Sequence, residues 1–229
     1  MTWVQTYSGV AFELLAPRAE DVRAADLAHA LAHSCRFGGH TRSHYSVAQH
    51  SSLVAALVWQ RTRDLGATLL GLLHDAHEAY TGDIKKPVKW AIEAVAPGAL
   101  RAIEGPIDAA IFAWAGDTRL GMGAPAEQVK RADAEILLWE RDAFLGQPPT
   151  ARAGEHLRER IGASDFGVTE GATLLDPWPA QIAERVFLYA LSVMVPHRAP
   201  RDVPVPPAWL FNDLRRALPC PGVAEKAGR

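Results

Sequence analysis

Apolar residues recur every three or four positions along most of this chain, a spacing that collects them on one face of an α-helix. The pattern therefore predicts an all-α protein. Prolines and glycines separate the helical stretches, as Gly82 does after one of them. We expect helices over about residues 21–33, 46–63, 66–80, 87–92, 98–115, 125–144, 179–194 and 209–214.

The segment over residues 66–80 is apolar on most of its sides, which predicts a helix near the centre of the fold. Its predecessor, 46–63, has an apolar face that includes Val47, His50 and Val54. Before that helix, the pair Gly38-Gly39 predicts a loop in which the backbone needs freedom or approaches another group closely.

The organisation along the chain predicts a single domain over residues 1–229. A helical core is expected over about residues 20–146, because periodicity weakens and turn formers become frequent after it. The remainder, about 147–229, is expected to be a partly helical C-terminal extension that is rich in proline from Pro196 onward. Near the N-terminus, residues 7–15 predict a short extended piece.

The composition is that of an ordinary globular protein, with 48% hydrophobic and 22% charged residues among 229. A formal net charge of -2 provides no global attraction to nucleic-acid polymers or anionic membranes, so neither is expected as a partner. We expect no signal peptide and no membrane span, and hence a cytoplasmic protein. The two cysteines, Cys35 and Cys220, are far apart in sequence and are expected to be reduced thiols.

The doublet His74-Asp75 lies within the apolar stretch 69–78, where a buried unpaired carboxylate would cost several kcal/mol. A divalent cation removes that cost, because it pairs the carboxylate and accepts the imidazole lone pair. His50 and Asp133 also interrupt apolar helical faces. These four residues form a mixed nitrogen and oxygen set that suits one divalent Mn, Fe, Co, Ni or Zn ion with open positions.

In this order, His50, His74-Asp75 and Asp133 resemble the H…HD…D pattern of the HD-domain metal-dependent phosphohydrolases. The chain resembles most closely the nucleotidase-like branch of that family, over about residues 30–145. The further matching features are Arg36-Phe37, Glu78, Asp83 in Thr81-Gly82-Asp83-Ile84-Lys85-Lys86-Pro87, and Asp133 in Lys130-Arg131-Ala132-Asp133.

The resemblance implies an HD-domain helical bundle with a metal held by the four residues. We expect Glu78, one turn beyond His74, to orient or deprotonate the attacking water, and Asp83 to bind that water or protonate the leaving oxygen. The phosphate needs cationic partners, for which Arg36 offers a planar fork and Lys85 or Lys86 a point charge. Phe37, beside Arg36, is the aromatic candidate for substrate contact.

The activity that the resemblance implies is hydrolysis of a deoxynucleoside monophosphate to nucleoside and phosphate, as in a 5'-deoxynucleotidase. An alternative with the same ligand set is cleavage of a deoxynucleoside triphosphate to nucleoside and triphosphate. A different class is a sensor that binds a nucleotide or metal without turnover. The expected partner is a small nucleotide, and the resemblance also allows a homodimer.

Each candidate has a structural alternative. Arg36 would instead form a buried ion pair, and Asp83 would cap the helix that follows it. His29 and His33 are four residues apart, a spacing that can bind zinc on a helix, as are His40 and His44. Neither pair encloses the glutamate of a metalloprotease motif, so we interpret both pairs as mostly structural.

Overall fold

The computed structural model describes residues 1–116, 123–147, 163–166, 173–200, 202–203 and 205–219. This part of the chain is mostly helical, as predicted, with a two-stranded antiparallel sheet near the N-terminus. The helices are α1 (Ala24–His33), α2 (Val47–Thr62), α3 (Leu65–Leu73), α4 (Glu78–Thr81), α5 (Lys86–Val95), α6 (Ala99–Ala115), α7 (Ala124–Phe144), α8 (Ala180–Met194) and α9 (Ala208–Ala217).

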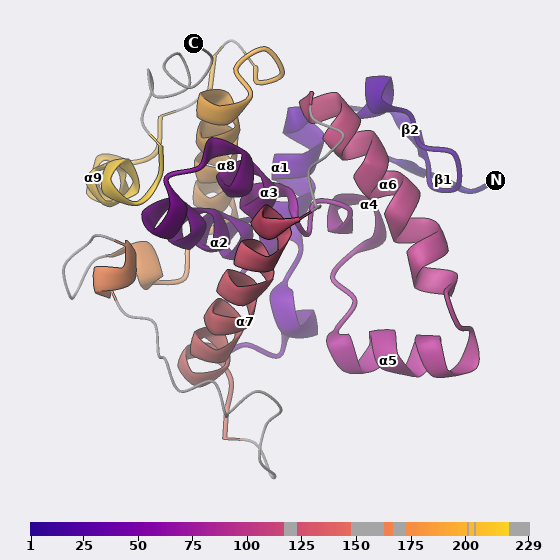
Figure 1. Cartoon of the computed structure of the whole chain (residues 1–229), viewed down its shortest axis with the longest axis horizontal. Helices are drawn as coiled ribbons and strands as arrows, with labels where there is room; N and C mark the ends of the chain where they lie inside the picture. The colour runs from indigo at the N-terminus through magenta and orange to yellow at the C-terminus, as the bar shows by residue number, and fades with distance from the viewer. Residues whose placement is uncertain (117–122, 148–162, 167–172, 201, 204, 220–229) are drawn as a thin grey trace.

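Helix α2 lies at the centre of the bundle, where it packs against α1, α3, α7, α8 and α9 (Figure 1). Every residue from Val47 to Trp59 is buried, including the polar ones. Ser46 caps the helix by accepting a hydrogen bond from the backbone N–H of Gln49. A helix that is buried on all sides can present polar groups only to partners on its neighbours, and His50 is such a group.

Helices α2 and α3 approach each other at Gly71. A Cβ atom at this position would lie 3.2 Å from the Cα and 3.3 Å from the backbone N of Ala55. Glycine is favoured here by close backbone approach rather than by a left-handed conformation. The contact lies one turn before His74, so it sets the distance between the two helices beside the candidate site.

The predicted helix over residues 66–80 ends earlier than expected. Helix α3 stops at Leu73, and the chain then forms tight turns in which Ala76 N–H donates to Leu73 and Glu78 N–H donates to Asp75. The His74 ring donates to the carbonyl of Gly71, an acceptor that a continuing α-helix would use for residue 75. The doublet therefore lies at a helix end, not within a helix, and the short α4 resumes at Glu78.

The N-terminal sheet pairs β1 (Trp3–Gln5) with β2 (Ala11–Glu13). Strand β2 lies within the extended piece predicted over residues 7–15, whereas β1 was not predicted. The strands rest on the helices through Phe12, which is fully buried and stacks on Tyr80 of α4 at 3.6 Å between ring centroids.

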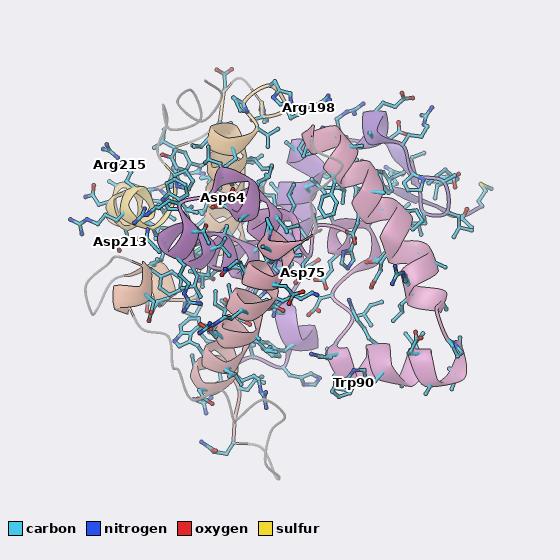
Figure 2. The ribbon with its side chains drawn as sticks, in the orientation of Figure 1. Asp64, Asp75, Trp90, Arg198, Asp213 and Arg215 are labelled. Carbon is cyan, nitrogen blue, oxygen red and sulfur yellow. The ribbon has the colours of Figure 1, made fainter. Side chains whose placement is uncertain are left out.

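Helix α5 projects from the edge of the molecule and packs against α6 (Figure 1). None of its residues is buried, and Trp90 is exposed (Figure 2). It extends over more residues than the predicted 87–92. Its start at Lys86 places the basic segment before Pro87 close to the end of α4.

Parts of the predicted C-terminal extension are helical, since α8 and α9 match the expected helices near residues 179–194 and 209–214. Most of the stretch over 146–178 lies outside the described residues, as does Cys220. Cys35 has a free thiol, as predicted. Among the described helices, none is long and apolar enough to cross a membrane.

Candidate metal centre

The four residues predicted as metal ligands lie together among three helices. His50 is on α2, His74 and Asp75 follow α3, and Asp133 is on α7. Oδ1 of Asp133 lies 3.2 Å from Nε2 of His50 and 3.9 Å from Nε2 of His74. Oδ2 of Asp75 lies 3.2 Å from Nε2 of His74 and 3.7 Å from Nε2 of His50. Figure 2 shows Asp75 beside α7, near the middle of the view.

The two imidazoles direct the same nitrogen atom toward this point. Nδ1 of His74 lies 2.8 Å from the carbonyl oxygen of Gly71, which can only accept, so Nδ1 carries the proton. Nδ1 of His50 likewise donates to Oε1 of Glu140 at 2.6 Å. In neutral rings both Nε2 atoms then carry lone pairs, and they lie 3.3 Å apart. Two facing lone pairs require a cation or a shared proton between them.

The charges around the site favour positive charge at the imidazoles. Burial lowers the pKa of His74, but Asp75, Asp133 and the Gly71 carbonyl outweigh burial and raise this pKa to about 9. Burial raises the pKa of the Asp75 carboxyl, but His74 outweighs it and holds that pKa well below its usual range. The two carboxylates therefore stay ionised, and a divalent cation would balance their two charges.

The spacing of the donor atoms fits a metal ion. Ligands that bind one ion at about 2.1 Å, with angles between square and tetrahedral, lie about 3.0 to 3.4 Å from one another. Of the separations from Nε2 of His50 to its three neighbours, 3.2 and 3.3 Å lie within that range and 3.7 Å exceeds it. Donor atoms of His50, His74 and Asp133 all lie within 4.8 Å of one another, so this group can hold a metal ion. The side chain of Asp133 is 39% exposed, which leaves one side of the site open.

Glu140 supports the site from behind and was not predicted as a functional residue. It is fully buried on α7, with both carboxylate oxygens occupied. Oε1 accepts from His50 and from the hydroxyl of Tyr45 at 2.7 Å, and Oε2 accepts from Arg36 at 3.1 and 3.2 Å. Such a carboxylate behind a ligand histidine fixes the ring and its tautomer. The available signal was its spacing, because Glu140 follows Asp133 by two helical turns and therefore lies on the same face of α7.

Arg36 forms the buried ion pair that was its structural alternative. Its guanidinium binds Glu140, and its Nη1 atom also lies 3.5 Å from Oδ2 of Asp75. The next residue, Phe37, has a left-handed backbone with a φ of 57°, a conformation that costs a non-glycine residue about 1 kcal/mol or more. Its ring centroid lies 5.6 Å from the Arg36 guanidinium carbon. The loop thus holds both residues at the edge of the site, and their contact with substrate stays a prediction.

Glu78 begins α4 as a buried carboxyl group beside the metal candidates. Its Oε2 atom has no hydrogen-bond partner in the described part of the chain. Burial, followed by the charges of Asp75 and Asp83, raises the pKa of Glu78 to about 9. Asp83 does not cap the following helix, because Lys85 occupies the N-cap of α5 and no side chain caps it. The alternative role for Asp83, capping of the helix that follows it, is therefore not observed.

A second polar network joins the turn before α4 to α6. Nδ1 of His77 lies 3.0 Å from Asp108, and Nε2 lies 3.7 Å from Glu104. Nζ of Lys89 lies 3.1 Å from the same Glu104 carboxylate and 3.9 Å from Glu78. Periodicity did not predict this network, because its members belong to three consecutive helical segments and meet only through the packing of those segments.

The two predicted basic substrate residues differ in position. Lys85 lies against the loop that carries Arg36 and Phe37, since a Cβ atom on Gly38 would lie 2.8 Å from its Nζ. Lys86 is exposed, and its Nζ lies 5.9 Å from the ring centroid of Trp90. The structure therefore brings Lys85, but not Lys86, into contact with the predicted site loop.

Comparison with known proteins finds no matching family model. The chain is 36% identical over 144 residues to YfdR, an uncharacterized protein of Escherichia coli (strain K12). The aligned region covers 62% of this chain and 71% of YfdR. It is also 42% identical over 94 residues to an uncharacterized protein of Rhodobacter capsulatus. That aligned region covers 39% of this chain and 48% of the relative.

Proposed function

We propose that this chain, which belongs to the same family as YfdR of Escherichia coli, is an HD-type metal-dependent phosphohydrolase. Its proposed substrate is a deoxynucleoside monophosphate, and the proposed products are the nucleoside and inorganic phosphate. The metal would be a divalent Mn, Fe, Co, Ni or Zn ion held by His50, His74, Asp75 and Asp133.

The single observation that carries this proposal is the convergence of two imidazole nitrogens and two carboxylates. Both Nε2 atoms are 3.3 Å apart, and each has a carboxylate oxygen 3.2 Å away. The chain order of these groups is that of the HD-type enzymes. The donor set differs from that of a structural zinc site, which normally includes cysteine sulfur.

A divalent ion bound here would polarise a phosphoryl oxygen and acidify a bound water molecule. We assign proton transfer to Glu78, because its carboxyl group is buried near Asp75 and its Oε2 atom has no hydrogen-bond partner in the described part of the chain. A divalent ion bound at the site would lower the pKa of this carboxyl group and favour the carboxylate that accepts a proton. Asp83, which raises the pKa of Glu78 through its charge, is assigned to the leaving oxygen.

The phosphate of the substrate would be bound by cationic groups at the edge of the site. Arg36 is assigned to this edge, with its guanidinium anchored by Glu140. Lys85 lies over the loop of residues 36–39 and supplies a further positive charge. Phe37 offers an apolar surface next to them for the sugar or base. Lys86 is assigned to the outer part of the same basic segment.

A substrate panel tests the proposal. Untagged protein, depleted of metal and reloaded with Mn²⁺, Co²⁺ or Zn²⁺, is incubated with deoxynucleoside monophosphates and triphosphates, and release of phosphate and triphosphate is followed. We expect metal-dependent phosphate release from monophosphates. Triphosphate release alone would move the assignment to a triphosphohydrolase. No release from any nucleotide would overturn the hydrolase assignment in favour of a non-catalytic sensor.

A single substitution tests the role of Glu78. Glu78→Gln keeps the shape of the side chain and removes its ability to accept a proton, so turnover should fall by about 100-fold to 10,000-fold. Metal content, measured by elemental analysis, should stay at the wild-type level. The matched control is Glu127→Gln, an exposed glutamate on α7. If Glu78→Gln turns over substrate like the control, Glu78 is not the proton acceptor.

A further inference from the structure

A second histidine–carboxylate cluster lies where α1 meets α8. It consists of His29 and His33, four residues apart on α1, and Glu184 on α8. One donor atom from each residue lies within 4.8 Å of the others. We propose that these three residues form a second transition-metal site, separate from the central one, which links α1 to α8.

The tautomer of His33 is one that suits a metal ligand. Its Nδ1 lies 2.8 Å from the backbone carbonyl of His29, so Nδ1 donates its proton and Nε2 carries the lone pair. Ligand histidines generally donate their second nitrogen to a carbonyl or carboxylate in this way. Because the side chain is exposed, Nε2 can bind an ion from solvent without rearrangement of the core.

His29 and Glu184 supply the other two donors from adjoining helices. Nδ1 of His29 lies 3.2 Å from Oε2 of Glu184, which is within the separation expected for two ligands of one ion. The His29 ring contacts two others, with Tyr7 stacked at 3.7 Å and His33 tilted at 4.2 Å between centroids. This stacking limits the freedom of the ring, so less entropy is lost when it binds an ion.

The donor set defines the class of ion. Two imidazoles and one carboxylate suit Zn²⁺, Co²⁺, Ni²⁺ or Cu²⁺, whereas Mg²⁺ and Ca²⁺ prefer oxygen ligands alone. Three protein donors leave at least one position for water, because the cluster is partly exposed. A bound ion would join α1 to α8, two helices that already pack against each other. It would stabilise the fold, since the unfolded chain does not bring the donors together.

Metal stoichiometry tests this proposal independently of the proposed function. Untagged, metal-depleted protein is equilibrated with Zn²⁺ buffered in the low micromolar range, and bound zinc is measured by elemental analysis. His33→Ala should bind one equivalent fewer than wild type and should lose the part of the zinc-induced rise in melting temperature that this site provides. His197→Ala, an exposed histidine outside both clusters, should match wild type.

The outcomes separate the two sites. If both proposals hold, wild type binds two equivalents and His33→Ala binds one. If the central site does not bind zinc, wild type binds one equivalent and His33→Ala binds none, so the two proteins still differ by one equivalent. Glu184→Gln should weaken binding at the second site, because it removes one of the three donors. Equal zinc content and affinity in wild type and His33→Ala would overturn this inference.

Discussion

Two histidine–carboxylate clusters in this protein use the same chemical groups at different depths. In the central cluster, His50 and His74 come from different helices and meet in the interior. In the α1–α8 cluster, His29 and His33 come from consecutive turns of one helix and lie at the surface. The central imidazoles are held by a buried carboxylate and a carbonyl, while His33 is held by a carbonyl of its own helix.

The groups that contact the ligand histidines, more than the ligands themselves, distinguish the two clusters. Behind His50, Glu140 joins Arg36 and Tyr45 in a fully buried network. His29 instead stacks on the ring of Tyr7 and is partly exposed to solvent. Burial makes each polar group costly to leave unpaired, so in the metal-free protein the central cluster should contribute more to folding stability than the surface cluster.

The largest contrast is expected from substitution of the supporting carboxylate. Glu140→Gln removes the counter-charge of Arg36 in the interior, and breaking such a buried pair costs about 3 to 5 kcal/mol of unfolding free energy. It should also weaken central metal binding by about tenfold to hundredfold. Urea unfolding of the metal-free protein measures the first effect and zinc titration the second. Glu127→Gln on the same helix serves as the control, and equal stability of the two variants would contradict the coupling.

A smaller contrast is expected from pH. The pKa of His74 is raised in the folded protein from 6.5 to about 9, so its stabilising contribution is complete below about pH 6.5. That contribution is lost as the pH rises through about 9, and it amounts to at most about 3 kcal/mol. Metal-free protein should therefore become less stable between these values in urea unfolding at each pH. A saturating divalent ion should reduce the loss, because it replaces the proton on the ring. Constant stability of the metal-free protein over this range would show that His74 is not charged in the fold.

The smallest effect is expected at the surface. Glu184→Gln removes the partner of His29, and an exposed pair of this kind contributes less than about 1 kcal/mol. Urea unfolding of the metal-free variant should differ from wild type by no more than that. A loss of unfolding free energy comparable to that of Glu140→Gln would show that the α1–α8 cluster contributes as much to stability as the central network, and would contradict the proposed difference between the two clusters.

The helical periodicity was sufficient to predict most of the fold, because each long helix buries a continuous apolar face. It could not predict where α3 ends, because the ending depends on the hydrogen bond from His74 to the carbonyl of Gly71. Nor could it predict β1, a three-residue segment that forms a strand only by pairing with β2. Both features arise from interactions that local pattern does not contain.

The site could be predicted at the level of residue types that interrupt apolar faces. The positions of His50, His74, Asp75 and Asp133 follow from that rule, and the structure brings them together. Glu140 obeys the same rule but was not singled out, because its partners Arg36 and Tyr45 are about a hundred residues away in sequence. For Arg36, a buried ion pair was expected only as the alternative to phosphate binding, and its partner Glu140 was not predicted. Whether these groups bind metal and substrate stays a prediction.

The close packing at Gly71 has an evolutionary consequence. A methyl group there would meet backbone atoms of Ala55, so no smaller side chain on α2 could make room for it. The helices would have to separate by a few tenths of an ångström, and with them the two imidazoles, each attached to one helix. We therefore expect descendants that retain the central site to retain glycine at this position, and descendants that replace it to have lost the histidine pair as well.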